Sequence, residues 1–389
     1  MGDSTRRPIL KGLASFRTAW LVVLGCASVT GCSTAFFYSQ VLRGHLEIWA
    51  SREVVDDVIS SPRTTQRRRQ ALIDTAAILE FAGSEMALAA RGRYLRVAEI
   101  DRRYVVWNVV AAEMFSTEAM ARCYPVVGCA AYRGYFSFEG ASNEAQRLRS
   151  RGYDVHVRGV AAYSTLGWFD DPLLSTFLEW PVERLAELLF HELAHVVVYV
   201  AGDTAFNEAY ASFVGERGAM RWLEARGDDV EQYRKDRQAG VRLNNYLMTW
   251  RERMRQLYAV ELPVATKLAR KNWAMQEIGR CYRQYRALLG AGQFDSYMEE
   301  PFNNARLAEI STYRRWLPAF EALFLSGNGD WQTFHADVLA LSELSREARF
   351  ARLLQLSEEE EAKARNDEST EEIECEPFFD HTIHAEATG

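Results

Sequence analysis

Apolar positions recur along most of the chain with the spacing of an α-helix. Before residue 92 this spacing predicts two amphipathic helices, and from 219 to about 356 it predicts a mostly helical region. Residues 93–165 differ, because three runs there are rich in β-branched and aromatic side chains. The runs predicted as strands are 104–112, 130–138 and 153–160, and a helical pattern at 141–151 separates the last two. The pattern therefore predicts a mainly helical α+β fold with a small mixed sheet.

A strongly apolar helical run follows this sheet. Pro181 stands at a first-turn position, and the run continues through Val200 to a predicted stop at Gly202. Within it, His191 and His195 are four residues apart, so a helix places both imidazoles on one face, where they can bind a single Zn²⁺. Buried without a ligand, such polar groups would each cost on the order of 1–3 kcal/mol. The run therefore predicts a buried helix that binds metal.

Glu192 directly follows the first of these histidines and is predicted to stand beside the metal. Its carboxylate can accept a proton from a water molecule there, which is the general-base role in HExxH metallopeptidases. A catalytic zinc site also needs a third protein ligand and an open position. Ala201 stands where metzincins place a third histidine, so that ligand arrangement is excluded.

Two glutamates after the motif are candidates for the third ligand. A second helix is predicted to start at Asn207, with this residue as its cap, and a short hairpin would bring Glu208 back toward the histidines. Glu216 is the rival, but it lies two helical turns beyond Glu208, roughly 12 Å away, so both cannot bind one ion. The glutamate that does not bind is then a solvated acid or one that supports the ligands.

The segment before the motif helix, residues 161–174, contains glycine, paired acids and proline, and it is predicted to be a loop beside the site. Asp170 or Asp171 in this loop could hold the α-ammonium of a peptide, orient a histidine or cap a helix. Peptide hydrolysis also needs a donor for the developing oxyanion. The tyrosines considered for this role, each of which is also compatible with simple aromatic packing, are Tyr163, Tyr210 and Tyr313.

Composition places the chain among globular proteins, with 48% hydrophobic and 25% charged residues. The formal net charge of -7 argues against nucleic acid as a partner. Much of the acidity lies in residues 357–389, which are predicted to form a disordered tail. His381 and His384 in this tail are expected to bind metal weakly at most.

The first residues have the organisation of a signal peptide. Four basic residues precede an apolar run at 20–27 that is too short for an ordinary membrane span. Residues 29–32, Val-Thr-Gly-Cys, then resemble a bacterial lipobox, which predicts that residues 1–31 are removed and Cys32 is acylated. A simple secretory signal or a signal anchor is the alternative. Ser33 favours the outer membrane over the inner membrane, with the mature chain facing the periplasm.

Export changes the interpretation of the cysteines, because disulfides persist in oxidising compartments. Cys123 and Cys129 enclose a turn-rich interval and are a disulfide candidate, with free buried thiols as the alternative. Cys281 and Cys375 are predicted to be unpaired or incidental.

The HELAH motif at 191–195, followed by the Asn-Glu pair at 207–208, resembles the gluzincin metallopeptidases. More specifically, the chain resembles the putative aminopeptidase family of proteobacterial lipoproteins. The segments that carry this resemblance are the lipobox at Cys32 and residues 105–116, 126–136, 162–176, 190–195, 203–218 and 303–320. The resemblance implies an α+β region over 32–356 built around a zincin-like helix hairpin, with parts at 32–92, 93–217 and 218–356.

Carried over residue by residue, the resemblance implies that one Zn²⁺ per chain is held by His191, His195 and Glu208, with Glu192 as the catalytic base. It favours Glu208 over Glu216 as the third ligand. Ser212 is a departure, because thermolysin-like enzymes have an aspartate there that orients a zinc ligand.

The function predicted is that of a membrane-anchored aminopeptidase, which hydrolyses peptide bonds through a zinc-activated water. A zinc endopeptidase is one alternative. Another is an envelope lipoprotein that is stabilised by zinc and acts as a binding or assembly scaffold. The partners expected are a peptide substrate and the lipid bilayer.

Overall fold

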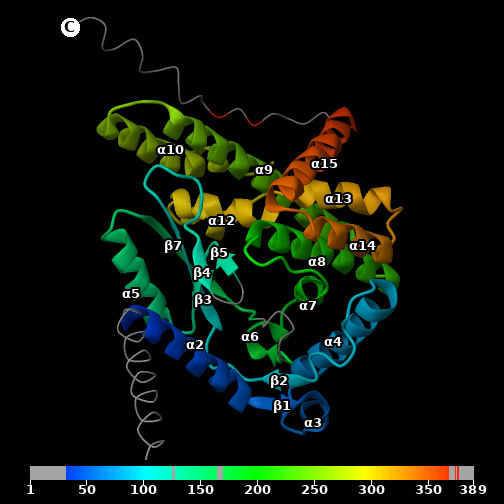
Figure 1. Cartoon of the computed structure of the whole chain (residues 1–389). Helices are drawn as coiled ribbons and strands as arrows, with labels where there is room; N and C mark the ends of the chain where they lie inside the picture. Colours follow the sequence, from blue (N-terminus) through cyan, green and yellow to red (C-terminus); the bar gives the residue numbers. More distant parts are fainter. Residues whose placement is uncertain (1–31, 125–127, 164–169, 368–372, 374, 376–389) are drawn as a thin grey trace, which may run out of the picture. The chain divides into compact units, whose positions relative to one another are not determined.

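The computed structural model describes residues 32–124, 128–163, 170–367, 373 and 375 (Figure 1). The chain divides into two compact units, residues 1–51 and 52–389. Helix α2 (Cys32–Ala50) is the described part of the first unit. The predicted signal peptide, residues 1–31, lies outside the described residues. Among the helices that are described, none combines the length and the apolar character needed to cross a membrane.

The second unit begins with a short strand where a helical region was predicted. Strand β1 (Arg52–Val54) pairs antiparallel with β2 (Arg96–Ala98), which pairs parallel with β8 (Leu173–Leu174). The prediction of helices alone before residue 92 is therefore wrong at β1, because pairing with a distant strand overrides the local pattern. The helices of this part are α3 (Val55–Ser60) and α4 (Gln66–Glu85).

The predicted sheet is present, with its three strands in the order β6-β3-β7. Its members are β3 (Val106–Ala112), β6 (Arg133–Tyr135) and β7 (Asp154–Val160). Both pairings are antiparallel, so this sheet is not mixed as predicted; the parallel pair belongs to the β1-β2-β8 sheet. Two helices pack on the β6-β3-β7 sheet, α5 (Phe138–Arg149) and α12 (Asn304–Arg314) (Figure 1).

A separate hairpin carries the predicted disulfide. Strands β4 (Arg122–Tyr124) and β5 (Gly128–Ala130) pair antiparallel with Cys123 opposite Cys129, and the two cysteines are bonded. The hairpin reaches the motif region, because the Thr204 hydroxyl donates to the Cys129 carbonyl oxygen at 3.4 Å.

The motif helix α7 (Val182–Val197) and the next long helix α8 (Thr204–Arg226) pack closely against each other. Helix α7 starts directly after Pro181 but ends at Val197, before the predicted stop at Gly202, with Val198 already in extended conformation. The consecutive valines at 196–198 have branched side chains that favour this extended exit. A short helix, α6 (Ser175–Leu178), precedes α7.

The remainder of the described chain is helical, as predicted for residues 218–356. Its helices, apart from α12, are α9 (Glu231–Ala259), α10 (Val264–Gln284), α11 (Asp295–Glu299), α13 (Leu317–Ser326), α14 (Trp331–Ser342) and α15 (Arg346–Asp367). Helix α15 extends past residue 357, so the first part of the predicted disordered tail is helical.

Cys281 and Cys375 form a second disulfide, so the prediction that they are unpaired is wrong. Cys281 is fully buried on α10, and Cys375 is also buried in the same apolar cluster. The two residues are 94 positions apart, so their pairing depends on tertiary packing that a local pattern does not contain. His381 and His384 lie outside the described residues.

Candidate functional site

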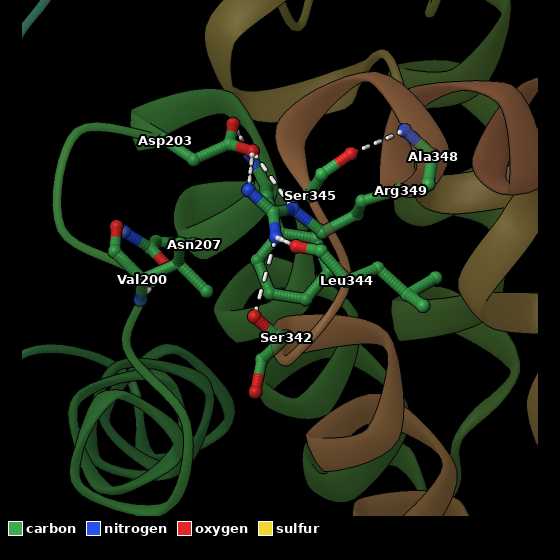
Figure 2. Close-up of polar contacts among 9 residues, drawn as sticks. Val200, Asp203, Asn207, Ser342, Leu344, Ser345, Ala348 and Arg349 are labelled. Carbon is green, nitrogen blue, oxygen red and sulfur yellow. Dashed lines mark hydrogen bonds and ion pairs between the residues drawn. The ribbon is translucent and has the colours of Figure 1, made fainter.

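The turn between α7 and α8 is held by one asparagine side chain (Figure 2). Asn207 accepts a hydrogen bond from the Val200 backbone N–H at 2.8 Å and donates its amide to the Val200 carbonyl oxygen at 2.8 Å. It lies inside α8, which begins at Thr204, so the predicted role as helix cap is wrong. The cap is Asp203, which accepts from the Phe206 N–H at 3.3 Å.

The same turn is braced from a distant part of the chain, as Figure 2 shows. The buried Arg349 of α15 donates two hydrogen bonds to one Asp203 carboxylate oxygen, at 2.9 and 2.7 Å. Its remaining terminal nitrogen donates to the carbonyl oxygens of Ser342 and Leu344, at 3.2 and 2.8 Å. The start of α8 is therefore fixed by a charged pair that the sequence analysis did not identify.

The helix pair brings together the three predicted ligands. The Nε2 atoms of His191 and His195 are 3.2 Å apart. One Glu208 carboxylate oxygen lies 3.4 Å from Nε2 of His191 and 3.8 Å from Nε2 of His195. The side chains of His195 and Glu208 are only 5% and 11% exposed, whereas that of His191 is 19% exposed. The three ligand atoms thus converge, and the side chain of His191 is the most exposed of the three.

These distances fit a metal ion. Bonds of about 2.0–2.2 Å in tetrahedral geometry place neighbouring ligand atoms roughly 3.3–3.6 Å apart. The three observed separations, between 3.2 and 3.8 Å, surround that range. Two imidazole nitrogens and a carboxylate oxygen also form a donor set that divalent transition metals bind. The group His191, His195 and Glu208 can therefore hold a metal ion.

Burial at one position and neighbouring charges at another favour the forms that bind metal. Burial lowers the pKa of His195 to about 4, which keeps this imidazole neutral. Burial alone would raise the pKa of Glu208, but the hydrogen bond from His191 and the nearby histidine charges lower it. For His191, burial opposes the charged form, yet the hydrogen bond to Glu208 and the charge of Glu192 raise its pKa. Of the three groups, His191 therefore holds its proton up to the highest pH when no metal is bound.

His195 has a second ring nitrogen, Nδ1, which is not one of the three converging ligand atoms. Nδ1 of His195 is buried, and among the described residues it has no hydrogen-bond partner. The residue that orients the histidines is not predicted from the sequence, because Ser212 stands at the position of the expected aspartate. Ser212 lies partly buried on α8, four residues after Glu208.

The rival glutamate is engaged elsewhere. Glu216 forms ion pairs with Arg237 at 2.9 Å and with Arg314 at 2.7 Å. Arg237 also pairs with Glu187 at 3.2 Å, and Glu187 precedes His191 by one helical turn on α7. Glu216 is therefore part of a charged network that joins α7, α8, α9 and α12, and it does not belong to the ligand group.

The three tyrosines considered as oxyanion donors have different surroundings. Tyr210 is fully buried, and its hydroxyl bonds to Nδ1 of His335 at 2.8 Å. It follows Glu208 by two residues, so the helix turns it toward the other side of α8, and the structure does not place it in the site. Tyr163 packs against Phe136 with ring centroids 5.1 Å apart. The side chain of Tyr313 lies outside the described residues.

Tyr94 lies near Glu192 and Asp171 and was missed by the sequence analysis. Burial and the negative charges of these two acids raise its pKa well above the ordinary value. Its backbone has a φ of 55°, a left-handed conformation that is uncommon for a residue with a side chain. No sequence signal marks such a position, because the conformation follows from the surrounding fold.

Asp171, which belongs to the predicted set, and Tyr199, which does not, lie in the same region. Asp171 raises the pKa of Tyr163 after burial, so it lies near both Tyr163 and Tyr94, whereas Asp170 is exposed. Tyr199, at the exit of α7, has its ring centroid 6.4 Å from that of His195. Burial and the charge of Glu208 raise the pKa of Tyr199. Tyr199 therefore lies near the predicted ligands, whereas Tyr94 and Asp171 lie near the predicted base Glu192 and near each other.

Comparison with known proteins gives one match. A family model described as "Putative aminopeptidase" matches residues 36–353, which is most of the chain and includes every residue of the ligand group. No curated protein and no solved structure matches the chain.

Proposed function

The chain belongs to the "Putative aminopeptidase" family, and on that premise we propose that it is a zinc-dependent aminopeptidase of the gluzincin type. The observation that carries this proposal is the convergence of His191, His195 and Glu208, with Glu192 between the histidines on the same helix. The family supports peptidase activity, and the donor set supports zinc as the metal.

In this proposal, His191, His195 and Glu208 hold the zinc ion, one per chain. When bound, zinc supplies Lewis acidity, which polarises the scissile carbonyl and makes a water molecule acidic enough to attack near neutral pH. Glu192, which is partly exposed beside the ligands, accepts the proton from that water and passes it to the leaving amine.

Tyr94 and Tyr199 are the proposed hydrogen-bond donors to the oxyanion, in place of Tyr210. Their raised pKa values keep both hydroxyls protonated, as a donor must be. Asp171, like Glu192, lies near Tyr94 and is proposed to hold the α-ammonium of the substrate. A carboxylate that closes one end of the site would select peptides with a free amino end.

The proposal includes a lipid anchor. Cys32, the first residue of α2, would be acylated after removal of residues 1–31 and would hold the protein on the outer membrane, facing the periplasm. Support for this part comes from the lipobox-like residues 29–32.

The decisive experiment combines metal analysis with hydrolysis of aminoacyl reporter substrates. The purified chain should contain about one zinc, and Glu192→Gln should retain it while losing at least about 100-fold in turnover. Glu183→Gln, about two and a half turns earlier on α7, is the matched control and should change neither. Zinc without hydrolysis across a diverse peptide library would contradict the peptidase proposal and favour a scaffold. Cleavage of only blocked or internal bonds would show an endopeptidase.

A further inference from the structure

Helix α2 exposes a continuous apolar stripe. Four large apolar residues are between 38% and 60% exposed: Tyr38, Leu42, Leu46 and Trp49. Their spacing of four, four and three residues places them within an arc of about 80° on one side of the helix. Arg43 and Glu47 lie on the neighbouring arc, so the stripe has a polar border. A helix with this distribution needs an apolar contact along the stripe.

We propose that this stripe lies on the surface of a phospholipid bilayer. Its composition fits an interface between lipid and water: two leucines lie in the centre, and an aromatic residue with a polar tip lies toward each end. The helix carries Arg43 and Glu47, whose opposite charges leave no strong electrostatic attraction to lipid headgroups. The contact is therefore apolar, and added salt should not weaken it.

The position of α2 in the chain supports a bilayer as the occupant. The helix begins at Cys32, the residue acylated in the proposed function, and Tyr38 follows only about 9 Å further along the helix axis. Acyl chains inserted at Cys32 would hold this end of the helix at the membrane surface with no linker between them. The exposed side chains of the stripe then contact that surface directly.

The size of the stripe argues against a second copy of the chain as the occupant. The four residues expose roughly 400 Å², about half of the ~800 Å² that each partner buries in a stable protein interface. A membrane contact has no such minimum, because the acyl chains already provide attachment and the stripe only fixes the orientation of the helix.

Photo-crosslinking from single positions of the full chain tests the proposal. The protein is expressed with a benzoylphenylalanine at Leu42, Leu46 or Glu47, purified after processing, and placed in vesicles of phosphatidylethanolamine and phosphatidylglycerol. Positions 42 and 46 should give at least about tenfold more lipid adduct than position 47, which lies on the polar side of the same helix. The ratio should be unchanged at high salt.

The proposal would be overturned if positions 42 and 46 formed adducts with this chain's own residues 52–389 instead of lipid. Adducts with a second copy of the chain instead of lipid would overturn it as well. Equal lipid labelling at all three positions would overturn it too. The proposal uses acylated Cys32 from the proposed function, so the mass of the processed chain is measured in the same sample. Aminoacyl hydrolysis is measured there as well. Hydrolysis without lipid adducts contradicts only the membrane contact, whereas adducts without hydrolysis contradict only the peptidase.

Discussion

Gly215 of α8 lies directly against the backbone of Glu187 on α7. A Cβ atom at position 215 would be 2.6 Å from the Glu187 carbonyl oxygen and 3.3 Å from Cβ of His191. Distances below 3.0 Å to backbone atoms force a shift of one helix, and here the helix that moves carries either the histidines or Glu208. The close approach of the two helices is therefore a condition for the convergence of the three ligands.

Gly215→Ala should accordingly destabilise the protein by about 1–3 kcal/mol and weaken metal binding. Gly240→Ala is the matched control, because Gly240 also lies within a helix and nothing approaches its missing Cβ within 4 Å. That change should be neutral or stabilising by up to about 1 kcal/mol. Denaturant unfolding and metal titration of both variants provide the measurement. Equal stability of the two variants would show that the helices have room to separate.

The brace on the α7–α8 turn gives a second prediction. Arg349→Met keeps the length of the side chain but leaves the Asp203 carboxylate, 17% exposed, without its charged partner. Loss of one member of a buried pair costs about 3–5 kcal/mol. Arg352→Met, at an exposed position of the same helix, should change stability by less than about 0.5 kcal/mol.

Adding Asp203→Asn to Arg349→Met should recover part of that loss, since no unpaired charge then remains. The coupling between the two sites follows from the double-mutant cycle of unfolding free energies. Additive effects of the two substitutions would mean that the pair seen in Figure 2 does not fix the turn.

Features that depend on local spacing were predictable from the sequence. The four-residue separation of His191 and His195 places them on one face of any helix, and the short loop after α7 made Glu208 the nearest returning acid. The three strands of the β6-β3-β7 sheet follow from runs of β-branched or aromatic residues. The Cys123–Cys129 bond also links residues only six positions apart.

Features that depend on distant packing were not predictable. Arg349 reaches Asp203 across 146 residues, and Cys281 reaches Cys375 across 94. Neither pair has a spacing that would distinguish it from other charged or cysteine residues. Tyr94 lies near Glu192, which it precedes by 98 residues, and its backbone has a left-handed conformation that no local pattern indicates. Tyr210 was misplaced for a simpler reason: a difference of two residues from Glu208 turns it to another side of α8.

The buried hydrogen-bonded chain at His335 makes stability depend on pH. Its Nε2 lies 3.0 Å from the Met86 carbonyl oxygen, which can only accept, so Nδ1 carries no proton and accepts from the Tyr210 hydroxyl. Burial lowers the pKa of His335 to about 4 from an unfolded value near 6.5. The unfolded chain therefore binds this proton first, so stability is full above about pH 6.5 and falls as the pH drops toward 4.

The loss from His335 alone should approach about 3 kcal/mol at pH 4. His156 and His195 also have pKa values lowered to about 4 and add to the same slope. His335→Gln should be less stable at pH 7 and should unfold with a slope between pH 6.5 and 4 that is smaller by one proton. Unfolding of the metal-free protein at several pH values tests this, and an unchanged slope would contradict it.

At a pH below the raised pKa of His191, metal binding should release one proton, and His191 should be its source. In the metal-free protein, the hydrogen bond to Glu208 and the charge of Glu192 outweigh burial and raise the pKa of His191. The pKa of Glu208 is lowered and that of His195 is lowered to about 4, so near neutral pH these two ligands already have their binding forms. Metal must therefore displace a single proton, and below the raised pKa of His191 its affinity should rise about tenfold per pH unit. Above that pKa the affinity should level off.

Calorimetric titration with zinc in two buffers of different ionisation enthalpy counts the protons directly. Glu216→Gln, which alters a glutamate outside the ligand group, should leave that number unchanged. Release of no proton, or of two, at a pH below the raised pKa of His191 would contradict the prediction that His191 alone supplies the proton.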